Sequence, residues 1–505
     1  MTRREFLSTA GGTATAAAVE RRLYANAASG VPVSKWRWVP PGEAQAPPDC
    51  VSALEVINKI NKMPPDGTRC IDFKIPSHRD PIHRPRWSEL KLEQNRDFRL
   101  QVIRDLNKAY DKMLSLPDDD CHSLVFQTCL HDFYCGGRWD GGDVHYTWDF
   151  LPWHRAFLYF QERIVARAAC NPCFRMPIWD WETDSTIPDY YCRKGLPNFV
   201  TCPKRTPETN LAFVRHEVGV GATQSWLLSK DFPSFIGTQT EYSYLKCNDG
   251  PHSAIHTNVV QGPMTGSPTS AADPLFYSHH ANVDRCFSYW LTRYRSYPRP
   301  DEWLDRCYYL YDEHHKLVRV RTRQILDESK LGYTYSDKPP VTLYDYFPKV
   351  VTDELWNNPI RLAELLTKLM LEMASAGLGA LLSSARFAEL PIRLMVTVPG
   401  QFAEPGVYNG VFLSNGKQES LIGGFGFFGH QMRDGTASIQ VPIRGCIDST
   451  IFDVLTPGNL LEAPAGGPLL ISVRSRKGPA KEQKLALHDV SPFELLVPTK
   501  LAGLL

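Results

Sequence analysis

Apolar side chains recur at helical spacing through the first two-thirds of the chain. Residues 98–115, 154–169 and 284–295 each place apolar residues three or four positions apart, which predicts one amphipathic helix in each segment. The first of these must end before Pro117, because proline cannot donate the backbone hydrogen bond that continues a helix. Long stretches without such periodicity separate the three segments. The pattern predicts a mainly α-helical bundle with long connecting loops.

The pattern changes after residue 345. Residues 346–387 contain a Leu- and Ala-rich stretch and are predicted to form a helical connector. From residue 388 onward, apolar and polar residues alternate, as one buried face of a strand requires, and Asn-Gly and Asp-Gly pairs favour hairpin turns. We therefore expect a helical domain over residues 28–345, followed by a smaller antiparallel β-domain over residues 388–505.

The chain has 505 residues, more than one ordinary hydrophobic core accommodates, which agrees with at least two domains. Its 56 basic and 55 acidic side chains leave a formal net charge of +1. This balance favours neither a nucleic-acid partner nor an anionic membrane surface. The sequence contains no run of about 18 apolar residues, so we expect no membrane-spanning helix.

Thirteen cysteines are a high count for an enzyme of the cytosol. They crowd at Cys121, Cys129 and Cys135, and again at Cys170 and Cys173. The crowding favours disulfides formed in an oxidising compartment, since no pair of cysteines recurs at the spacing of a zinc ribbon. Buried free thiols together with a metal site are the alternative.

The first 27 residues resemble an export signal. Arg3-Arg4 is similar to a twin-arginine motif, a weakly apolar stretch follows, and Ala25-Asn26-Ala27 has the pattern of a cleavage site. The sequence therefore predicts a cleaved signal peptide at residues 1–27, export to the periplasm or the cell exterior by the twin-arginine route, and a bacterial source. The alternative is a charged start to a folded domain.

Two stretches of the helical region hold six histidines that are suited to bind metal. The first contains His131, His145 and His154, and the second contains His252, His256 and His280. His252 and His256 are four residues apart, so a helix places both imidazoles on one face. Neither stretch carries the Glu-x-x-His pattern of a di-iron site, so three imidazoles from each favour a pair of copper ions with dioxygen between them. The alternative is that these histidines are ordinary packing or surface residues.

Longer motifs surround these histidines. Asp273-Pro274-x-Phe276-Tyr277-x-x-His280-x-x-x-Asp284 and Trp153-His154-Arg155-x-Phe157 resemble the copper-binding signatures of the tyrosinase, catechol oxidase and polyphenol oxidase family. The resemblance implies a dinuclear type 3 copper centre. The first copper would bind His131, His145 and His154, and the second His252, His256 and His280. The C-terminal β-domain resembles the shielding domain of plant members and is expected to cover this centre.

Cys135 lies four residues after His131, an arrangement similar to that of plant-type members of this family. The resemblance implies a thioether bond between Cys135 and His145, which would hold the orientation of one imidazole. A disulfide is the alternative for Cys135. One cysteine in a thioether would leave twelve, an even number for disulfide pairing.

The second motif contains three further residues of interest. The resemblance places His279 beside the second copper without binding it. Phe276 is expected to pack under the copper ligands, either as a core residue or as a wall of the site. Asp284 is expected either to orient a ligand and hold the two copper helices together, or to form a surface ion pair with Arg285.

Two departures from the family pattern concern the substrate. Members that hydroxylate monophenols readily often carry Asn directly after the first histidine of the second site, and Glu a few residues before it. Here Ser253 follows that histidine, and Asp249 is the nearby carboxylate. Ser267 stands where plant members often place a Phe over one copper, which would open the site. The altered residues near the first histidine of the second site argue against monophenol hydroxylation, whereas the opening at Ser267 argues for it.

The resemblance implies an enzyme that acts on small phenolic substrates. The expected reaction oxidises ortho-diphenols to ortho-quinones, with two copper ions as cofactors and dioxygen reduced to water. Additional monophenol hydroxylation is left open. An ortho-aminophenol oxidase with the same site and a hemocyanin-like reversible oxygen carrier are the alternatives. The sequence defines no oligomeric state.

Overall fold

The computed structural model describes the helical region most fully. The described residues are 51–61, 70–76, 80–136, 138–184, 186–192, 227, 232–237, 251–260, 262–266, 268–295, 299–336, 346–350, 361, 392–399, 408–414, 419–426, 428, 436–443, 470–477, 481–486 and 494–498. The predicted signal peptide, residues 1–27, lies outside them.

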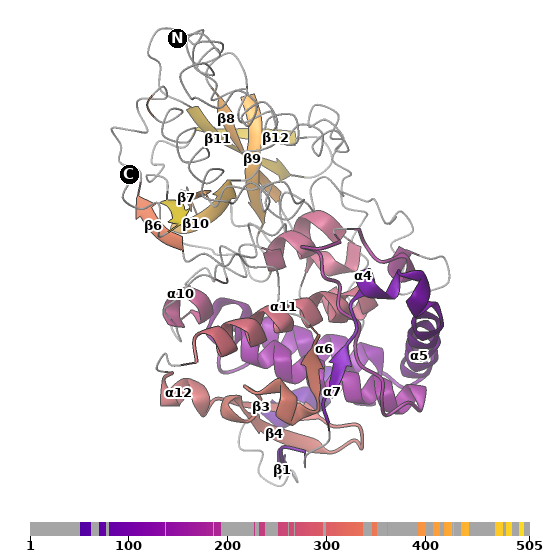
Figure 1. The fold of residues 1–505 in the computed structure, drawn as a ribbon. Helices are drawn as coiled ribbons and strands as arrows, with labels where there is room; N and C mark the ends of the chain where they lie inside the picture. Colours follow the sequence, from indigo (N-terminus) through magenta and orange to yellow (C-terminus); the bar gives the residue numbers. More distant parts are fainter. Residues whose placement is uncertain are drawn as a thin grey trace.

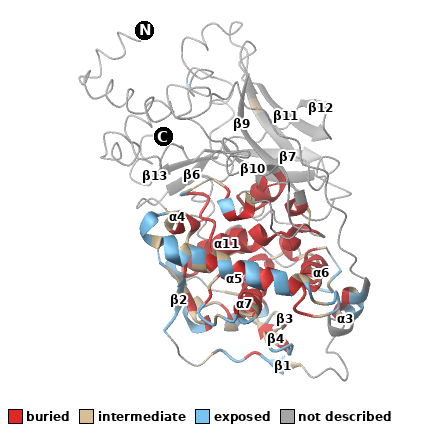
Figure 2. Cartoon of the chain, turned by 90° about the vertical axis from the view of Figure 1, so that its right-hand side faces the viewer, coloured by how far each residue is buried: buried red, intermediate tan, exposed pale blue. Residues whose placement is uncertain are grey.

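Four long helices form the centre of the fold: α5 (Arg96–Leu114), α6 (Leu124–Cys135), α7 (Phe150–Ala169) and α11 (Pro274–Arg293). α7 packs against both α5 and α11. α7 and α11 are buried along most of their length, whereas α5 exposes one face to solvent (Figure 2). The three segments with helical spacing lie in α5, α7 and α11, so the predicted helical core is confirmed.

α11 begins ten residues before the segment that apolar spacing predicted. Asp273 caps it: its carboxylate accepts a hydrogen bond from the backbone N–H of Leu275 at 3.1 Å. Pro274 occupies the first helical position, where its missing N–H costs nothing. The early turns of α11 are buried on every side, so they show no polar face for periodicity to detect.

Short helices and strands complete the helical domain. The short helices are α3 (Val51–Asn61), α4 (Trp87–Leu90), α10 (Phe232–Ile236) and α12 (Asp301–Leu304). One sheet has the order β1 (Ile71–Asp72), β4 (Leu317–Arg321), β3 (Cys307–Tyr311), and β2 (Ile82–Arg84) pairs in parallel with β5 (Tyr333–Tyr335). These strands could not be predicted from the sequence pattern, because two to five residues carry too little alternation to distinguish a strand from a loop.

Two four-stranded antiparallel sheets form the C-terminal region, beside the helical bundle in Figure 1. The first has the order β10 (Thr436–Ile443), β7 (Ile392–Pro399), β13 (Glu494–Pro498), β6 (Tyr346–Val350). The second has the order β12 (Lys481–Ala486), β11 (Leu470–Lys477), β8 (Tyr408–Ser414), β9 (Glu419–Gly426). The fold class is therefore as predicted: mainly α, with a smaller antiparallel β region after the helices.

The predicted helical connector is wrong at its start. Residues 346–350 form β6, which pairs with β13 in an antiparallel register that sets Tyr346 opposite Pro498. The pairing supplies the backbone hydrogen bonds of this segment, and its partner lies near the far end of the chain. Local pattern cannot reveal a partner so distant in sequence. Apart from Arg361, the rest of residues 351–387 lies outside the described residues.

Free thiols replace several of the expected disulfides. Cys121, Cys135, Cys170 and Cys173 are not disulfide-bonded, whereas Cys129 is. Cys129 and Cys135 are six residues apart on α6, which separates them by about 9 Å along the axis and is too far for a disulfide. Crowding in the sequence was therefore a poor guide to pairing.

None of the helices in the described part of the chain is both long enough and apolar enough to cross a membrane.

Candidate metal centre

The first group of metal-binding side chains gathers three histidines and a cysteine from three elements. α6 carries His131 and Cys135, the short 3-10 helix η3 (Val144–Tyr146) carries His145, and α7 carries His154. All four are buried, and one potential ligand atom of each lies within 4.8 Å of those of the others. The three histidines that the sequence singled out in this region are thus brought together.

The second group consists of His252, His256, His279 and His280, also buried and also within 4.8 Å of one another. His252 and His256 belong to a helical segment whose second half, η6 (Ile255–Val260), is a π-helix, a form common at functional sites. His280 Nε2, on α11, lies 3.3 Å from His252 Nε2 and 3.4 Å from His256 Nε2. These three nitrogens therefore converge on one point.

The two groups adjoin. The His154 and His280 rings stack with centroids 4.3 Å apart and planes inclined by 9°. The His145 and His252 rings stack at 5.5 Å. Phe276 lies against both groups, at 4.2 Å from the His280 ring and 4.9 Å from the His131 ring. The arrangement is one buried cage, and Phe276 forms an apolar wall in contact with both groups.

Hydrogen bonds define which nitrogen of several histidines faces the cage. His154 Nδ1 donates to the carbonyl oxygen of Phe150, and His256 Nδ1 donates to that of Met264, each at 2.8 Å. A carbonyl oxygen only accepts, so each Nδ1 carries the proton and each Nε2 keeps its lone pair. His145 Nδ1 lies 3.2 Å from an Asp143 carboxylate oxygen, which favours the same tautomer. Metal-binding histidines are oriented in this way.

The spacing of the converging nitrogens fits a metal ion. Ligand nitrogens about 2.0 Å from one tetrahedrally coordinated ion lie about 3.3 Å from each other. His280 Nε2 already shows this spacing to the Nε2 atoms of His252 and His256. The His256 Nε2 keeps a lone pair, because its Nδ1 carries the proton. His280, rather than the adjacent His279, completes this set.

Burial keeps the imidazoles uncharged. It lowers the pKa values of five rings well below the usual range for histidine: His154, His252, His256, His279 and His280. Neighbouring histidines add to the effect for His154, His252, His256 and His280, because one charged ring would repel the next. Neutral imidazole is the form that binds metal, so the cage is ready for an ion at neutral pH.

Cys135 is a buried thiol beside this cage. Its Sγ lies 4.0 Å from His154 Nε2 and within 4.8 Å of the potential ligand nitrogens of His131 and His145. Burial raises the pKa of the thiol well above its usual value. The alternative that Cys135 forms a disulfide is wrong, because Cys135 is a free cysteine.

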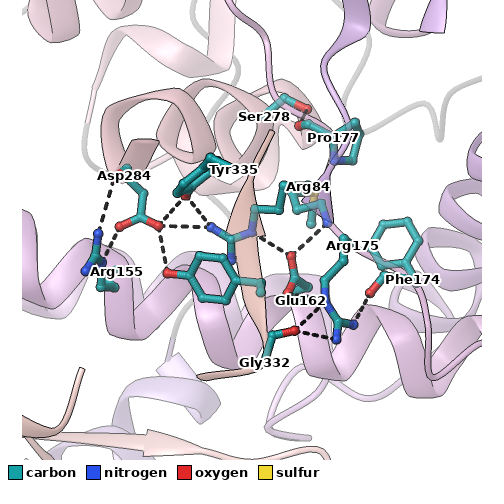
Figure 3. A network of polar contacts seen from close by, with 12 residues as sticks. Arg84, Arg155, Glu162, Phe174, Arg175, Pro177, Ser278, Asp284, Gly332 and Tyr335 are labelled. Carbon is teal, nitrogen blue, oxygen red and sulfur yellow. Dashed lines mark hydrogen bonds and ion pairs between the residues drawn. The ribbon is translucent and has the colours of Figure 1, made fainter. Parts of the chain in front are cut away.

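Asp284 ties α7 and α11 together (Figure 3). Its carboxylate accepts hydrogen bonds from Arg155 of α7, Arg84 of β2, and the Tyr333 and Tyr335 hydroxyls of β5. Burial alone would raise the pKa of Asp284, but Arg155 and Arg84 lower it below its usual value, so the carboxylate is charged. His154 and His280 are on the two helices that this contact joins.

The surface ion pair considered for Asp284 and Arg285 is wrong. Both side chains are buried, and Arg285 pairs instead with Glu182 at 2.5 Å. The two residues are adjacent on α11 and point in different directions, since successive helical residues are about 100° apart.

Phe428 is a residue of this site that sequence analysis missed. Its ring stacks on His256 at a centroid distance of 4.0 Å and meets His145 edge-on at 4.8 Å and His252 at 5.5 Å. It is 1% exposed. Phe428 follows β9 in the C-terminal region, and the one signal in the sequence is an aromatic run between glycines, Phe425-Gly-Phe-Phe428-Gly. Nothing in that run indicates contact with histidines from both groups.

Of the three residues that depart from the family pattern near the substrate, the structure describes one, Ser253. Ser253 is buried next to His252, and its backbone carbonyl accepts a hydrogen bond from the Thr257 hydroxyl at 2.8 Å. Asp249 and Ser267 lie outside the described residues.

Comparison with known proteins agrees with this geometry. The family model for the common central domain of tyrosinase matches residues 122–225 and 200–293, and that for the polyphenol oxidase middle domain matches residues 299–346. The chain is 32% identical to a chloroplastic polyphenol oxidase of Vitis vinifera and 30% identical to aureusidin synthase of Antirrhinum majus. The alignments cover 56% and 55% of this chain but only 52% and 56% of those proteins.

The fold is also similar to that of a solved structure of latent apple tyrosinase. The TM-score is 0.51 at 19% identity, over 85% of this chain and 99% of the apple protein. At that identity the likeness concerns the fold alone. The two family models show that residues 122–293 and 299–346 of this chain belong to the tyrosinase and polyphenol oxidase family of type 3 copper proteins, and both histidine groups lie within this part of the chain.

Proposed function

We propose that this protein is a polyphenol oxidase, which converts ortho-diphenols into ortho-quinones and reduces dioxygen to water. The observation that carries the proposal is the buried cage in which His252, His256 and His280 converge beside a second group of histidines. The relative from Vitis vinifera, a polyphenol oxidase, supports an oxidase of phenolic substrates.

Each residue of the cage has a definite part in this proposal. His131, His145 and His154 hold the first copper, and His252, His256 and His280 hold the second. The copper pair supplies the redox chemistry. Backbone carbonyls fix the rings of His154 and His256, so the site needs little rearrangement to receive metal. Phe276 closes one side of the cage and excludes water there.

We further propose that Cys135 forms a thioether with His145. The support is the position of the buried, unpaired Cys135 Sγ among the ring nitrogens of the first group. The bond would restrict the His145 ring, which η3 alone holds less firmly than a long helix would. Mass spectrometry of the peptide that joins the two residues tests this. The C–S bond replaces the Cys135 S–H and one C–H of the His145 ring, so the linked peptide is two hydrogens lighter; this is a two-electron oxidation, for which dioxygen at the copper pair would be the oxidant. Peptides that separate, with or without reduction, would contradict the bond.

The decisive test of the proposed reaction measures metal and oxygen together. Purified, copper-loaded protein should contain two coppers per chain and consume oxygen with catechol. His280→Ala should lose one copper and the activity, whereas His83→Ala, at an outlying histidine on β2, should keep both. Parallel assays with tyrosine and ortho-aminophenol define the substrate class. Reversible oxygen binding without turnover would instead indicate an oxygen carrier.

We propose that the protein is latent in this form, because Phe428 covers the cage. A phenol ring that approached His256 and His145 would need the place that the Phe428 ring now occupies. The solved apple protein of similar fold is itself described as latent. Activation would then require movement or removal of the segment that carries Phe428.

Substitution at Phe428 tests the latency. Phe428→Ala should raise the rate of catechol oxidation by the intact chain at least several-fold, and Phe428→Leu should have an intermediate effect. Phe98→Ala, at an exposed phenylalanine on α5, is the matched control and should leave the rate unchanged. Equal rates for the wild type and Phe428→Ala, before and after limited proteolysis, would exclude the idea.

A further inference from the structure

A third group of metal-binding side chains lies away from the copper cage. Cys121 and His122 lie in the turn before α6, and His315 lies in the hairpin turn that joins β3 and β4. One potential ligand atom of each residue lies within 4.8 Å of those of the other two. The fold thus brings one thiol and two imidazoles together from segments that are nearly 200 positions apart in sequence.

A hydrogen bond leaves one ring nitrogen of His122 with a lone pair for a metal ion. Its Nε2 lies 2.8 Å from the carbonyl oxygen of Asp312, so Nε2 donates its hydrogen and Nδ1 keeps its lone pair. Its backbone N–H donates to Asp120 Oδ1 at 2.8 Å, which fixes the turn. The side chain is buried, and burial lowers the pKa of the ring below its usual value, so the ring is neutral at neutral pH.

His315 is held over His122 by an unusual backbone. Its φ of +60° lies in the left-handed region, which residues other than glycine seldom adopt. The carbonyl of Asp312 accepts hydrogen bonds from the backbone N–H of His315 at 3.1 Å and from His122, so one oxygen connects both residues. The two rings stack with centroids 3.6 Å apart. The side chain of His315 is 53% exposed, which gives an ion access from solvent.

Cys121 supplies the soft ligand. Its thiol is buried and unpaired, and burial raises its pKa to about 12. The thiol is therefore protonated without metal, and a bound ion would displace that proton to solvent as the sulfur–metal bond forms. Its carbonyl accepts a hydrogen bond from Gln127 Nε2 at 2.6 Å, so the backbone of the turn is held to α6.

We propose that Cys121, His122 and His315 bind one soft or borderline transition-metal ion, of the class of Cu(I) or Zn(II), at a surface site separate from the copper cage. A thiolate with two imidazoles selects such ions over Mg²⁺ or Ca²⁺, which prefer oxygen ligands. Three protein ligands leave a fourth position for water. From Leu124 to His131, α6 rises about 10 Å, so the site cannot share an ion with the first histidine group.

The site is tested on the full chain with its copper cage loaded. Zn(II), or Cu(I) under nitrogen, is added in separate arms, excess metal is removed on a desalting column, and metal per chain is measured. We expect three ions per wild-type chain and two for Cys121→Ser and His315→Asn. Asparagine tolerates the left-handed backbone at position 315, so His315→Asn should preserve the turn. His314→Asn, the exposed neighbour, is the matched control and should keep three.

Co(II) provides an independent readout of the sulfur ligand. The wild type should develop a thiolate-to-cobalt charge-transfer band in the near ultraviolet, and Cys121→Ser should not. Retention of either Zn(II) or Cu(I) in the wild type, lost in both variants, supports the site. Two ions per chain in every arm, or a third ion that Cys121→Ser and His315→Asn retain, would overturn it. Catechol oxidation reports on the cage separately, so failure of one site does not imply failure of the other.

Discussion

At the scale of single residues, the partner behind each imidazole matters as much as the imidazole. His145 has a carboxylate, Asp143, behind its Nδ1, whereas His154 and His256 have backbone carbonyls. A backbone carbonyl cannot be removed by substitution, but Asp143 can. Of these three histidines, only His145 therefore allows a substitution to measure what the hydrogen bond to Nδ1 contributes to metal binding.

We expect Asp143→Asn to weaken retention of the first copper about 10-fold to 100-fold, the range found when the partner of a metal-binding histidine is removed. The amide is a weaker acceptor and no longer makes the ring a stronger base. Copper loss to a chelator, followed over time, measures the effect. Asp140→Asn, at an exposed carboxylate nearby, should retain copper like the wild type. Equal loss from both variants would show that Asp143 does not support His145.

At the scale of elements, α7, α11 and the β2–β5 pair meet at one buried carboxylate. Asp284 holds Arg155 and Arg84, and Arg84 also pairs with Glu162 at 2.8 Å (Figure 3). The Arg84 guanidinium lies 3.6 Å from the centre of the Tyr333 ring. Two cations are thus buried against two anions within a single network.

We expect Asp284→Asn to lower the free energy of unfolding by about 3 kcal/mol or more, because it leaves two buried guanidinium groups with one fewer negative charge. Thermal unfolding followed by circular dichroism measures the change. Asp72→Asn removes the partner of Arg319 in a solvent-exposed ion pair and should alter the melting temperature little. A melting temperature for Asp284→Asn within a degree of the wild type would show that the network does not hold the helices together.

At the scale of the whole molecule, the cage makes folding sensitive to acid. An unfolded chain protonates its histidines as the pH falls through about 6.5. The five buried rings with lowered pKa values stay neutral in the folded protein. The unfolded state therefore binds more protons below this pH, and the folded state loses stability there.

We expect metal-depleted protein to be most stable above pH 6.5 and to lose about 1 kcal/mol per buried histidine for each pH unit below it. Urea unfolding at pH 7.5, 6.5 and 5.5, at constant ionic strength, measures the trend. The loss for five rings would be a large part of the stability of an ordinary domain. An unchanged unfolding midpoint between pH 7.5 and 5.5 would contradict the neutral, buried state of these rings.

From the amino-acid sequence alone, the broad fold and the six histidines of the cage could be predicted, but not Phe428. Helical spacing is a local property, and it located α5, α7 and α11. The histidine motifs are also local, because ligands on one helix must follow its period. His252 and His256 were recognisable for this reason.

Contacts between distant parts of the chain become visible only in the folded molecule. The pairing of β6 with β13, the contact of Phe428 with His256, and the meeting of His122 with His315 each join segments that no local pattern relates. The same holds for Asp284: the sequence left a surface ion pair and a role between the helices both open, and the buried contacts with Arg84 and Arg155 decide for the second. Periodicity reports which face of an element is apolar, whereas the identity of the neighbour across that face is set by packing of the whole chain.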